Sequence, residues 1–262
     1  MQLTARPTTT TDVVQKLVNC VVGLAGHIYY TDQIRDMSTA IMDSACPLFA
    51  SLSPISGKES PANEGDDGFD VKSASIWSLR MIKGVLSQGG GSVTLEEVWA
   101  GSEGALAGRE SDVRMEYVDA LTTHVRSEAT GEEEQNDGRS LARFLNMIHV
   151  PIFNALKRGD AMPQDYWSIW VLVLVLFGAF RAMEAAKLLP VLWRMLETVS
   201  PTATPERQAC MEAIFLGFLA VVADAFAIPD LKSAVSAVKY FSIWLRVGNR
   251  STKDIRRMAC FH

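Results

Sequence analysis

Apolar residues recur at helical spacing from Thr11 to Tyr30 and give the predicted helix a wide apolar face. The residues of this face are Val13, Val14, Leu17, Val18, Val21, Val22 and Leu24. Thr31 or Asp32 is predicted to cap a second helix. Pro47 is expected to interrupt that helix, because proline lacks the N–H group that a helix interior needs. Together the two segments predict a helical hairpin.

Helical spacing continues through most of the remaining chain. Helices are predicted over 71–87, 110–128, 139–158, 163–180, 182–198, 205–227 and 230–247, with a short helix over 93–99. Two stretches that lack periodicity and are rich in acidic residues, 53–70 and 128–138, are predicted to be flexible loops. No convincing strand pattern interrupts this series, because the alternating letters "VLVLVL" belong to a longer apolar run.

Helices paired in hairpins of about forty residues are typical of HEAT and armadillo repeats. The chain is therefore predicted to be all-α, a helical-repeat solenoid segment of about ten antiparallel helices. The hydrophobic content of 48% is enough for a continuous core, so residues 1–262 are expected to form a single solenoid segment.

A short pattern supports the repeat interpretation. The stretches "TDQIRDM", "SDVRMEY" and "TKDIRRM" share an Asp shortly before an aliphatic and a basic residue. In a repeat the Asp would satisfy free N–H groups at a helix start, the aliphatic residue would pack inward, and the basic residue would bridge to the next repeat. Chance similarity is the alternative. The third copy opens a helix at Asp254 that is soon cut off, so the chain is expected to be a fragment.

Two apolar runs are long enough to raise the question of a membrane span. Tyr166–Phe180 is bounded by Asp165 and Arg181, and Ala213–Ala223 is shorter still. A spanning helix needs roughly twenty apolar residues. Both runs are therefore predicted to be buried helices, and no transmembrane span is expected.

The net charge of −5 is unevenly distributed along the chain. An acidic balance argues against a general nucleic-acid-binding surface. Basic residues prevail after Asp230, and Lys232, Lys239 and Arg246 lie on one side of the last predicted helix. They are the candidate contacts for a protein partner or an acidic surface, which allows at most peripheral membrane contact. A solvated helix face is the alternative interpretation.

The cysteines indicate a reducing compartment. They stand at positions 20, 46, 210 and 260, far apart and mostly in apolar surroundings. They are predicted to be reduced core thiols, which favours a cytosolic or nuclear protein.

Residue types that carry catalysis are not gathered in any recognisable motif. The sequence has no HExxH, CxxC, GxSxG or phosphate-loop pattern. His27 and His149 lie in apolar helices as core or edge residues, while His124 is placed at the side of its helix and Arg114 on a water-facing side. These patterns predict a protein that is not an enzyme and that has no metal and no cofactor. An adaptor, a membrane-peripheral scaffold and an enzyme with dispersed catalytic residues are the function classes that remain.

Three stretches resemble fungal members of the "eighty-five requiring" family. They are "ESDVRMEYVDAL" at Glu110, the Leu-Asn-x-Ile-His helix at Leu145, and "LLPVLWRMLE" at Leu188. Together they lie between Glu110 and Phe226, a little under half of the chain.

The resemblance implies a role at a membrane. Members of this family are helical-repeat scaffolds that anchor a phosphatidylinositol 4-kinase complex at the plasma membrane. The resemblance therefore implies a non-catalytic scaffold that helps recruit this complex, with lipid-kinase subunits among its protein partners and a cytoplasmic location at the plasma membrane.

One part of the resemblance fails at the N-terminus. Family members attach through an N-terminal basic surface and, in some, acylated cysteines, but here only Arg6 precedes Lys16, and Cys20 lies in an apolar helix. No attachment residue is transferred. The alternative is another helical-repeat adaptor, of the cohesin-loader or nuclear-transport type.

Overall fold

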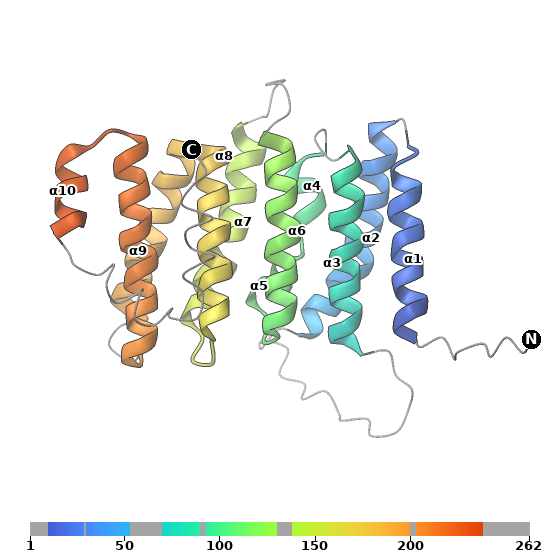
Figure 1. Ribbon diagram of the computed structural model, residues 1–262, viewed down its shortest axis with the longest axis horizontal. Helices are drawn as coiled ribbons and strands as arrows, with labels where there is room; N and C mark the ends of the chain where they lie inside the picture. The colour runs from blue at the N-terminus through green and yellow to red at the C-terminus, as the bar shows by residue number, and fades with distance from the viewer. Residues whose placement is uncertain are drawn as a thin grey trace, which may run out of the picture.

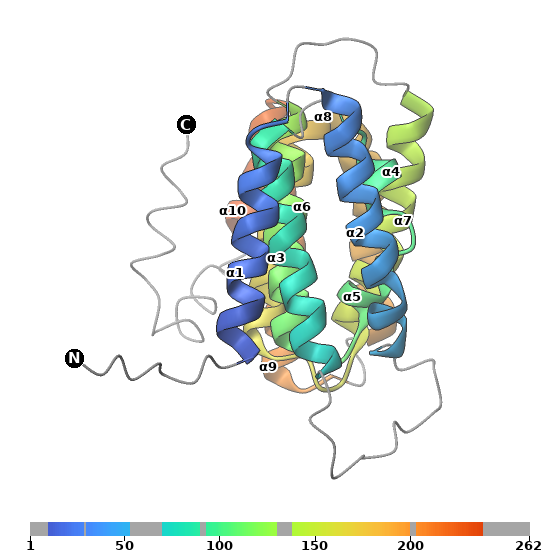
Figure 2. The same cartoon turned by 90° about the vertical axis from the view of Figure 1, so that its right-hand side faces the viewer.

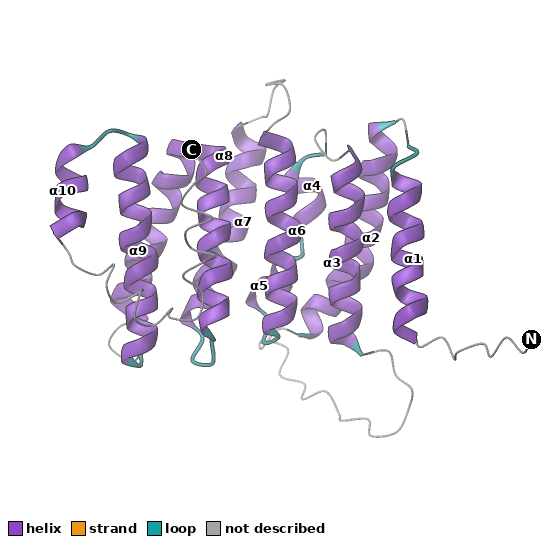
Figure 3. Cartoon of the chain, in the orientation of Figure 1, coloured by secondary structure: helices purple, strands orange, loops and turns teal. Residues whose placement is uncertain are grey.

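The computed structural model describes residues 10–28, 30–52, 70–89, 93–129, 138–199 and 203–237, and every regular element within them is an α-helix (Figure 3). The helices are α1 (Thr10–Ala25), α2 (Thr31–Ser51), α3 (Val71–Gly89), α4 (Leu95–Trp99), α5 (Glu103–Ala107), α6 (Ser111–Ala129), α7 (Gly138–Lys157), α8 (Pro163–Val199), α9 (Pro205–Ala225) and α10 (Pro229–Ala237). The all-α prediction is confirmed.

The helices stack in two layers along the length of the molecule (Figures 1 and 2). In one layer α1 packs on α3, α3 on α6, α6 on the first half of α8, and α8 on α9 (Figure 1). The other layer contains α2, α4, α5, α7 and the second half of α8. Stacked antiparallel hairpins of this kind form an α-solenoid, as the sequence predicts.

The core is continuous between the layers and runs from α1 to α9. Its largest fully buried side chains include Trp99, Tyr117, Phe49, Phe144 and Phe218. The rings of Trp99 and Tyr117 meet edge to face with 5.2 Å between centroids. Fully burying one large apolar side chain stabilises a fold by about 1.5–3 kcal/mol, so these residues are the main reason that the hairpins adhere.

Helix α8 is two helices joined at one residue. Arg181 has φ 45° and ψ −115°, which breaks the helical path, so the predicted division into 163–180 and 182–198 is confirmed. The second half runs back to the end of the molecule where the first half began. Arg207, near the start of α9, accordingly lies close to Tyr166 and hydrogen-bonds its hydroxyl at 3.2 Å. A non-glycine residue at positive φ is rare.

Several predicted boundaries differ from the structure. Pro47 lies inside α2, so the expected interruption is wrong. The carbonyl that loses its N–H partner belongs to Asp43, which is exposed, so water can hydrate it. Helix α5, with five residues, is missing from the prediction.

The predicted loops lie largely outside the described residues. In the loop predicted over 128–138, positions 128 and 129 belong to α6 and position 138 to α7. Residues 53–69 and 130–137 are outside the description, as is the part of the last predicted helix beyond Ala237.

The Asp–aliphatic–basic pattern behaves as predicted in two respects. Its aliphatic residues, Ile34 and Val113, are buried. Its basic residue bridges hairpins in the second copy, where Arg114 Nη2 lies 2.7 Å from Asp165 Oδ2. In the first copy Arg35 pairs within its own helix instead. The third copy is outside the described residues.

A series of ion pairs joins α3 to α6 at the surface. Lys72 contacts Glu110 and Asp112 at 3.4 and 2.5 Å, Arg80 contacts Glu116 at 3.1 Å, and Lys83 contacts Asp119. All the bases are on α3 and all the acids are on α6 or just before it. An exposed pair contributes at most about 1 kcal/mol, so the series favours one register between the helices more than it stabilises the fold.

Replacing Gly84 by Ala is expected to loosen α1. A Cβ at this position of α3 would overlap the Val22 side chain of α1, and valine is stiff about χ1. Overpacking of this kind costs about 1–3 kcal/mol. Urea denaturation should show the loss, and limited proteolysis should cleave α1 first. Gly23→Ala, in α1 with open space around it, is the control, and an equal loss there would contradict the packing argument.

Candidate interaction surfaces

Only one of the three predicted contact residues lies in the described structure. Lys232 is exposed on α10, and its Nζ lies 2.6 Å from Asp224 Oδ1. Lys239 and Arg246 are outside the described residues. The basic face therefore stays a prediction, and its one described member already has an acidic neighbour.

Arg114 and Asp165 form a buried ion pair between α6 and α8. Their side chains are 4% and 2% exposed, and the Arg114 Nε lies 3.1 Å from Asp165 Oδ1. Burial raises the pKa of the Asp165 carboxyl, but hydrogen bonds from Arg114, Ser111 and a backbone N–H outweigh burial and hold the pKa below its ordinary value. The prediction that Arg114 faces water is wrong, because the next hairpin covers this side of α6.

Two further arginines bind backbone carbonyls at the same end of the hairpins. Arg158, which follows α7, donates to the carbonyls of Ala107 and Gly108 at the end of α5. Arg207, at the start of α9, donates to the carbonyls of Lys157 and Arg158 at 3.2 and 2.5 Å. Each arginine thus satisfies the free carbonyls at the end of a helix in the preceding hairpin.

His124 is fully buried, so its predicted place at the side of a helix is wrong. Its Nδ1 accepts a hydrogen bond from Trp99 Nε1 at 2.9 Å, and its Nε2 lies 2.9 Å from the Val93 carbonyl oxygen. An indole N–H can only donate, so the proton of the neutral imidazole must be on Nε2. The ring links α6 to Trp99 at the end of α4 and to Val93, two residues before α4 begins.

His149 and Glu184 form a second buried pair, between α7 and the second half of α8. The His149 Nε2 lies 3.0 Å from both carboxylate oxygens of Glu184, whose side chain is fully buried. The prediction of a core or edge histidine is confirmed. The pair holds α7 and the second half of α8 together.

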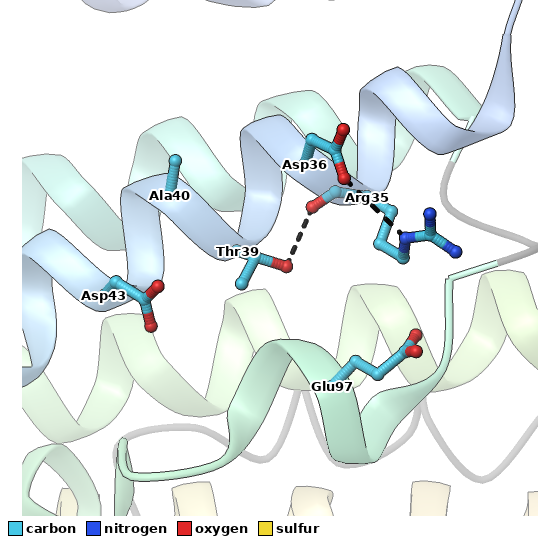
Figure 4. A pocket seen from close by; sticks show the side chains of 6 residues that line it. All are labelled: Arg35, Asp36, Thr39, Ala40, Asp43 and Glu97. Atoms are coloured by element: carbon cyan, nitrogen blue, oxygen red, sulfur yellow. Dashed lines mark hydrogen bonds and ion pairs between the residues drawn. The ribbon is translucent and has the colours of Figure 1, made fainter.

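An open cleft of about 460 Å³ lies between α2 and α4 (Figure 4). Its lining residues are Arg35, Asp36, Thr39, Ala40, Asp43 and Glu97. Figure 4 shows the Glu97 side chain approaching from α4 on the side where Arg35 leaves α2. Three carboxylates against one guanidinium make the cleft acidic, and its openness keeps them hydrated. It can accept basic side chains of a partner, but it has no nucleophile beside a base.

Three cysteines lie in the described part of the chain, and all are free thiols. Cys46 and Cys210 are partly buried, but Cys20 is exposed, so the core-thiol prediction is wrong there. Helix α1 is the outermost helix of its layer, and no further helix of the described residues covers that side (Figure 1). The described residues contain no group of three or more His, Cys, Asp or Glu side chains suited to a metal ion.

Two of the described helices are long and apolar enough to cross a membrane by length and composition alone. They are Pro163–Thr198 and Pro205–Ala225, with mean hydropathy of 1.9 and 1.6 in their most apolar windows. Of these windows, 39% and 28% are buried inside the protein. The same test is passed by core helices of soluble proteins, so the absence of a transmembrane span stays a prediction.

Similarity to known proteins covers most of the chain. Protein EFR3 of Coccidioides immitis is 21% identical over 89% of this chain, and protein efr-3 of Neurospora crassa is 23% identical over 80%. Protein efr3 of Aspergillus oryzae is 30% identical over 58%. The matched parts are 23%, 24% and 16% of these relatives, so the chain spans about a quarter of the length of the first two. No protein-family model and no solved structure matches the chain.

These relatives share one name, and four of them match between 80% and 89% of the chain. Over most of its length the chain is therefore similar to fungal proteins named EFR3, the "eighty-five requiring" proteins that its sequence resembles.

Proposed function

We propose that this chain is a non-catalytic part of a scaffold that helps recruit a phosphatidylinositol 4-kinase complex to the plasma membrane. The observation that carries the proposal is the similarity of most of the chain to several fungal proteins named EFR3. The role and the place at the cytoplasmic face of the membrane are those that the family resemblance implies. The partners are other proteins, among them subunits of the kinase complex.

The architecture supports a role in binding proteins. A solenoid offers long surfaces on both layers, and the arginine contacts between hairpins keep those surfaces in a fixed arrangement. The side chains of the two buried pairs already contact each other, and the arginines between hairpins already bind backbone carbonyls. Among the described residues, the acidic cleft beside α4 and the exposed side of α10 are two surface features that a partner can reach.

Membrane contact in this proposal is peripheral. Helix α8 breaks at Arg181, so its long apolar run is divided between two helices. The first half contains Asp165, paired with Arg114, and the second contains Glu184. Both side chains have partners inside the protein, which favours packing of these helices inside the solenoid.

Affinity capture of the tagged chain from cells of its source, followed by mass spectrometry, tests the proposal. The expected result is recovery of lipid-kinase subunits together with a share of the chain in the plasma-membrane fraction. Recovery of chromatin or nuclear-transport proteins in their place would favour the other helical-repeat adaptors and overturn the proposal, while leaving the fold intact.

Charge reversal then tests the predicted contact face. A Lys232→Glu, Lys239→Glu and Arg246→Glu variant is expected to recover kinase subunits several-fold less well, because like charges oppose an acidic partner surface. The control reverses Lys16, Arg126 and Arg194, which gives the same change in net charge elsewhere. Equal loss in both variants would assign the effect to net charge and reject the basic face.

A further inference from the structure

One residue makes the turn between the two halves of α8. Arg181 has φ 45° and ψ −115°, whereas the residues before and after it are helical. An L side chain at such a positive φ is strained, and the surrounding structure must hold it there. Glycine is the residue that usually occupies this conformation, because it has no Cβ to clash with the backbone. An arginine makes the turn here, so the fold carries its strain.

The sequence around this turn favours a straight helix. The stretch "AFRAMEAAKLL", residues 179–189, has neither glycine nor proline, and most of its residues are strong helix formers. The nearest glycine, Gly178, lies within the helix before the turn and has no positive φ. Local propensity and the observed bend therefore disagree, which means that packing elsewhere imposes the bend.

The bend is imposed by contacts between the second half of α8 and α7. The His149 Nε2 lies 3.0 Å from both carboxylate oxygens of Glu184, and Lys187 contacts Asn146. The paired residues are 35 and 41 positions apart in the sequence. Since the turn at Arg181 takes no part in these contacts, they form equally well when α7 and the half-helix belong to different molecules.

We propose that two copies of this chain exchange the segment from Ala182 onward, with Arg181 as the hinge. In the exchanged dimer the 37 residues of α8 form one straight helix, about 55 Å long. Its second half packs on α7 of the other copy, where Glu184 of one chain pairs with His149 of the other. The buried contacts of the monomer are formed again, and the strain at two hinges is released. Short strained hinges favour exchange of this kind.

A second copy supplies the surface that straightening removes. A straight α8 uncovers the side of α7 that carries His149, and the surface complementary to it is the second half of another α8. A two-fold axis beside Arg181 makes the exchange mutual, so neither copy keeps an uncovered core. The two Arg181 side chains lie near this axis, but the residue is exposed, so water and salt screen their repulsion.

Refolding at different concentrations measures the exchange. The full chain is unfolded in urea, refolded over a wide concentration series, and separated by size-exclusion chromatography with light scattering. The share of a dimer with twice the 28.7 kDa mass should rise with concentration. This dimer should persist on dilution, because its separation requires the second half of α8 to leave α7. A monomer at every concentration would overturn the proposal.

The hinge residue is tested by a matched pair of glycine variants. Arg181→Gly relieves the strain of the bend and disfavours the straight helix, so the dissociation constant from the refolding series should rise about a hundredfold. Arg194→Gly makes the same replacement at an exposed position of the second half of α8, which is helical in both forms. It should leave the dissociation constant unchanged. An equal share of dimer in Arg181→Gly and the unmodified chain would contradict the hinge.

Two complementary variants show whether the dimer is an exchanged one. His149→Glu places two carboxyls at the buried pair, and Glu184→His places two imidazoles there. When the two variants are refolded together, exchange restores one carboxyl and one imidazole at both pairs. Heterodimer should therefore exceed both homodimers several-fold in native mass spectrometry. A mixture without this preference would reject the exchange.

The control mixture contains Arg80→Glu and Glu116→Arg, which reverse a surface pair between α3 and α6. Both residues precede the hinge, so exchange cannot restore this pair, and no preference for heterodimer is expected. An equal preference in the control would assign the first result to net charge and reject the exchange. These measurements use the purified chain without kinase subunits, so the two proposals fail separately.

Discussion

Replacing Arg114 by Met is expected to lower the free energy of unfolding by about 3–5 kcal/mol at pH 7, since it leaves the Asp165 carboxylate buried without its counter-ion. The Gly108 carbonyl, which accepts a hydrogen bond from the same guanidinium, also loses a donor. Chemical denaturation in urea measures the change. Arg80→Met removes an exposed partner of Glu116 and should cost less than about 1 kcal/mol. Similar losses in the two variants would contradict the burial argument.

The pH dependence provides an independent check on this pair. The pKa of Asp165 is lower in the folded protein than its ordinary value, while an unfolded aspartate has a pKa of about 3.9. The carboxylate therefore contributes stability that is present above the unfolded pKa and is lost as pH falls through the folded pKa. Asp165→Asn should be less stable than the unmodified chain at pH 7, and the gap should narrow below about pH 4. A difference in the free energy of unfolding that stays constant on acidification would show that the Asp165 carboxylate does not stabilise the fold in this way.

Replacing His149 by Leu is the second large effect, about 1–3 kcal/mol, because the fully buried Glu184 carboxyl loses its hydrogen-bond partner. Replacing both residues by Leu should recover most of the loss, since replacing both partners of a buried hydrogen bond by apolar groups of similar shape can be nearly neutral. Denaturation of the two single variants and the double variant completes a mutant cycle. A double variant no more stable than His149→Leu would show that lost packing, and not the carboxylate, causes the effect.

A control at a nearby residue separates the contribution of the buried pair from that of the surface contact between the same two helices. Lys187 lies one turn beyond Glu184 and contacts Asn146 of α7 at the surface. Lys187→Met removes this exposed contact between the same two helices, and it should change the free energy of unfolding by less than about 1 kcal/mol.

The sequence predicted the helices well because apolar periodicity decides them locally. It even located the break at Arg181, where a long apolar run meets a charged residue. It could not predict that Arg114 is buried, because its partner Asp165 lies in the next hairpin and the pairing depends on how the hairpins stack. His124 was misplaced for the same reason, since Trp99 and Val93 reach it from outside its own helix.

Helix α1 shows a different limit of sequence reasoning. Its wide apolar face predicted a helix with much to bury, yet only part of that face meets α3. Periodicity states how much of a helix is apolar, but not how many neighbours it has. The predicted basic contacts share this limit, because Lys232 is exposed but paired with Asp224, a contact that helical spacing alone does not show.

The arginine contacts also bear on how the solenoid deforms. Arg114, Arg158 and Arg207 all lie at the end of the hairpins where α7 turns into α8, and they tie neighbouring hairpins together there. A bend that opens this edge must stretch charge-assisted hydrogen bonds, whereas a bend toward it leaves them in place. The solenoid is therefore stiffer against bending that opens this edge than against bending that closes it.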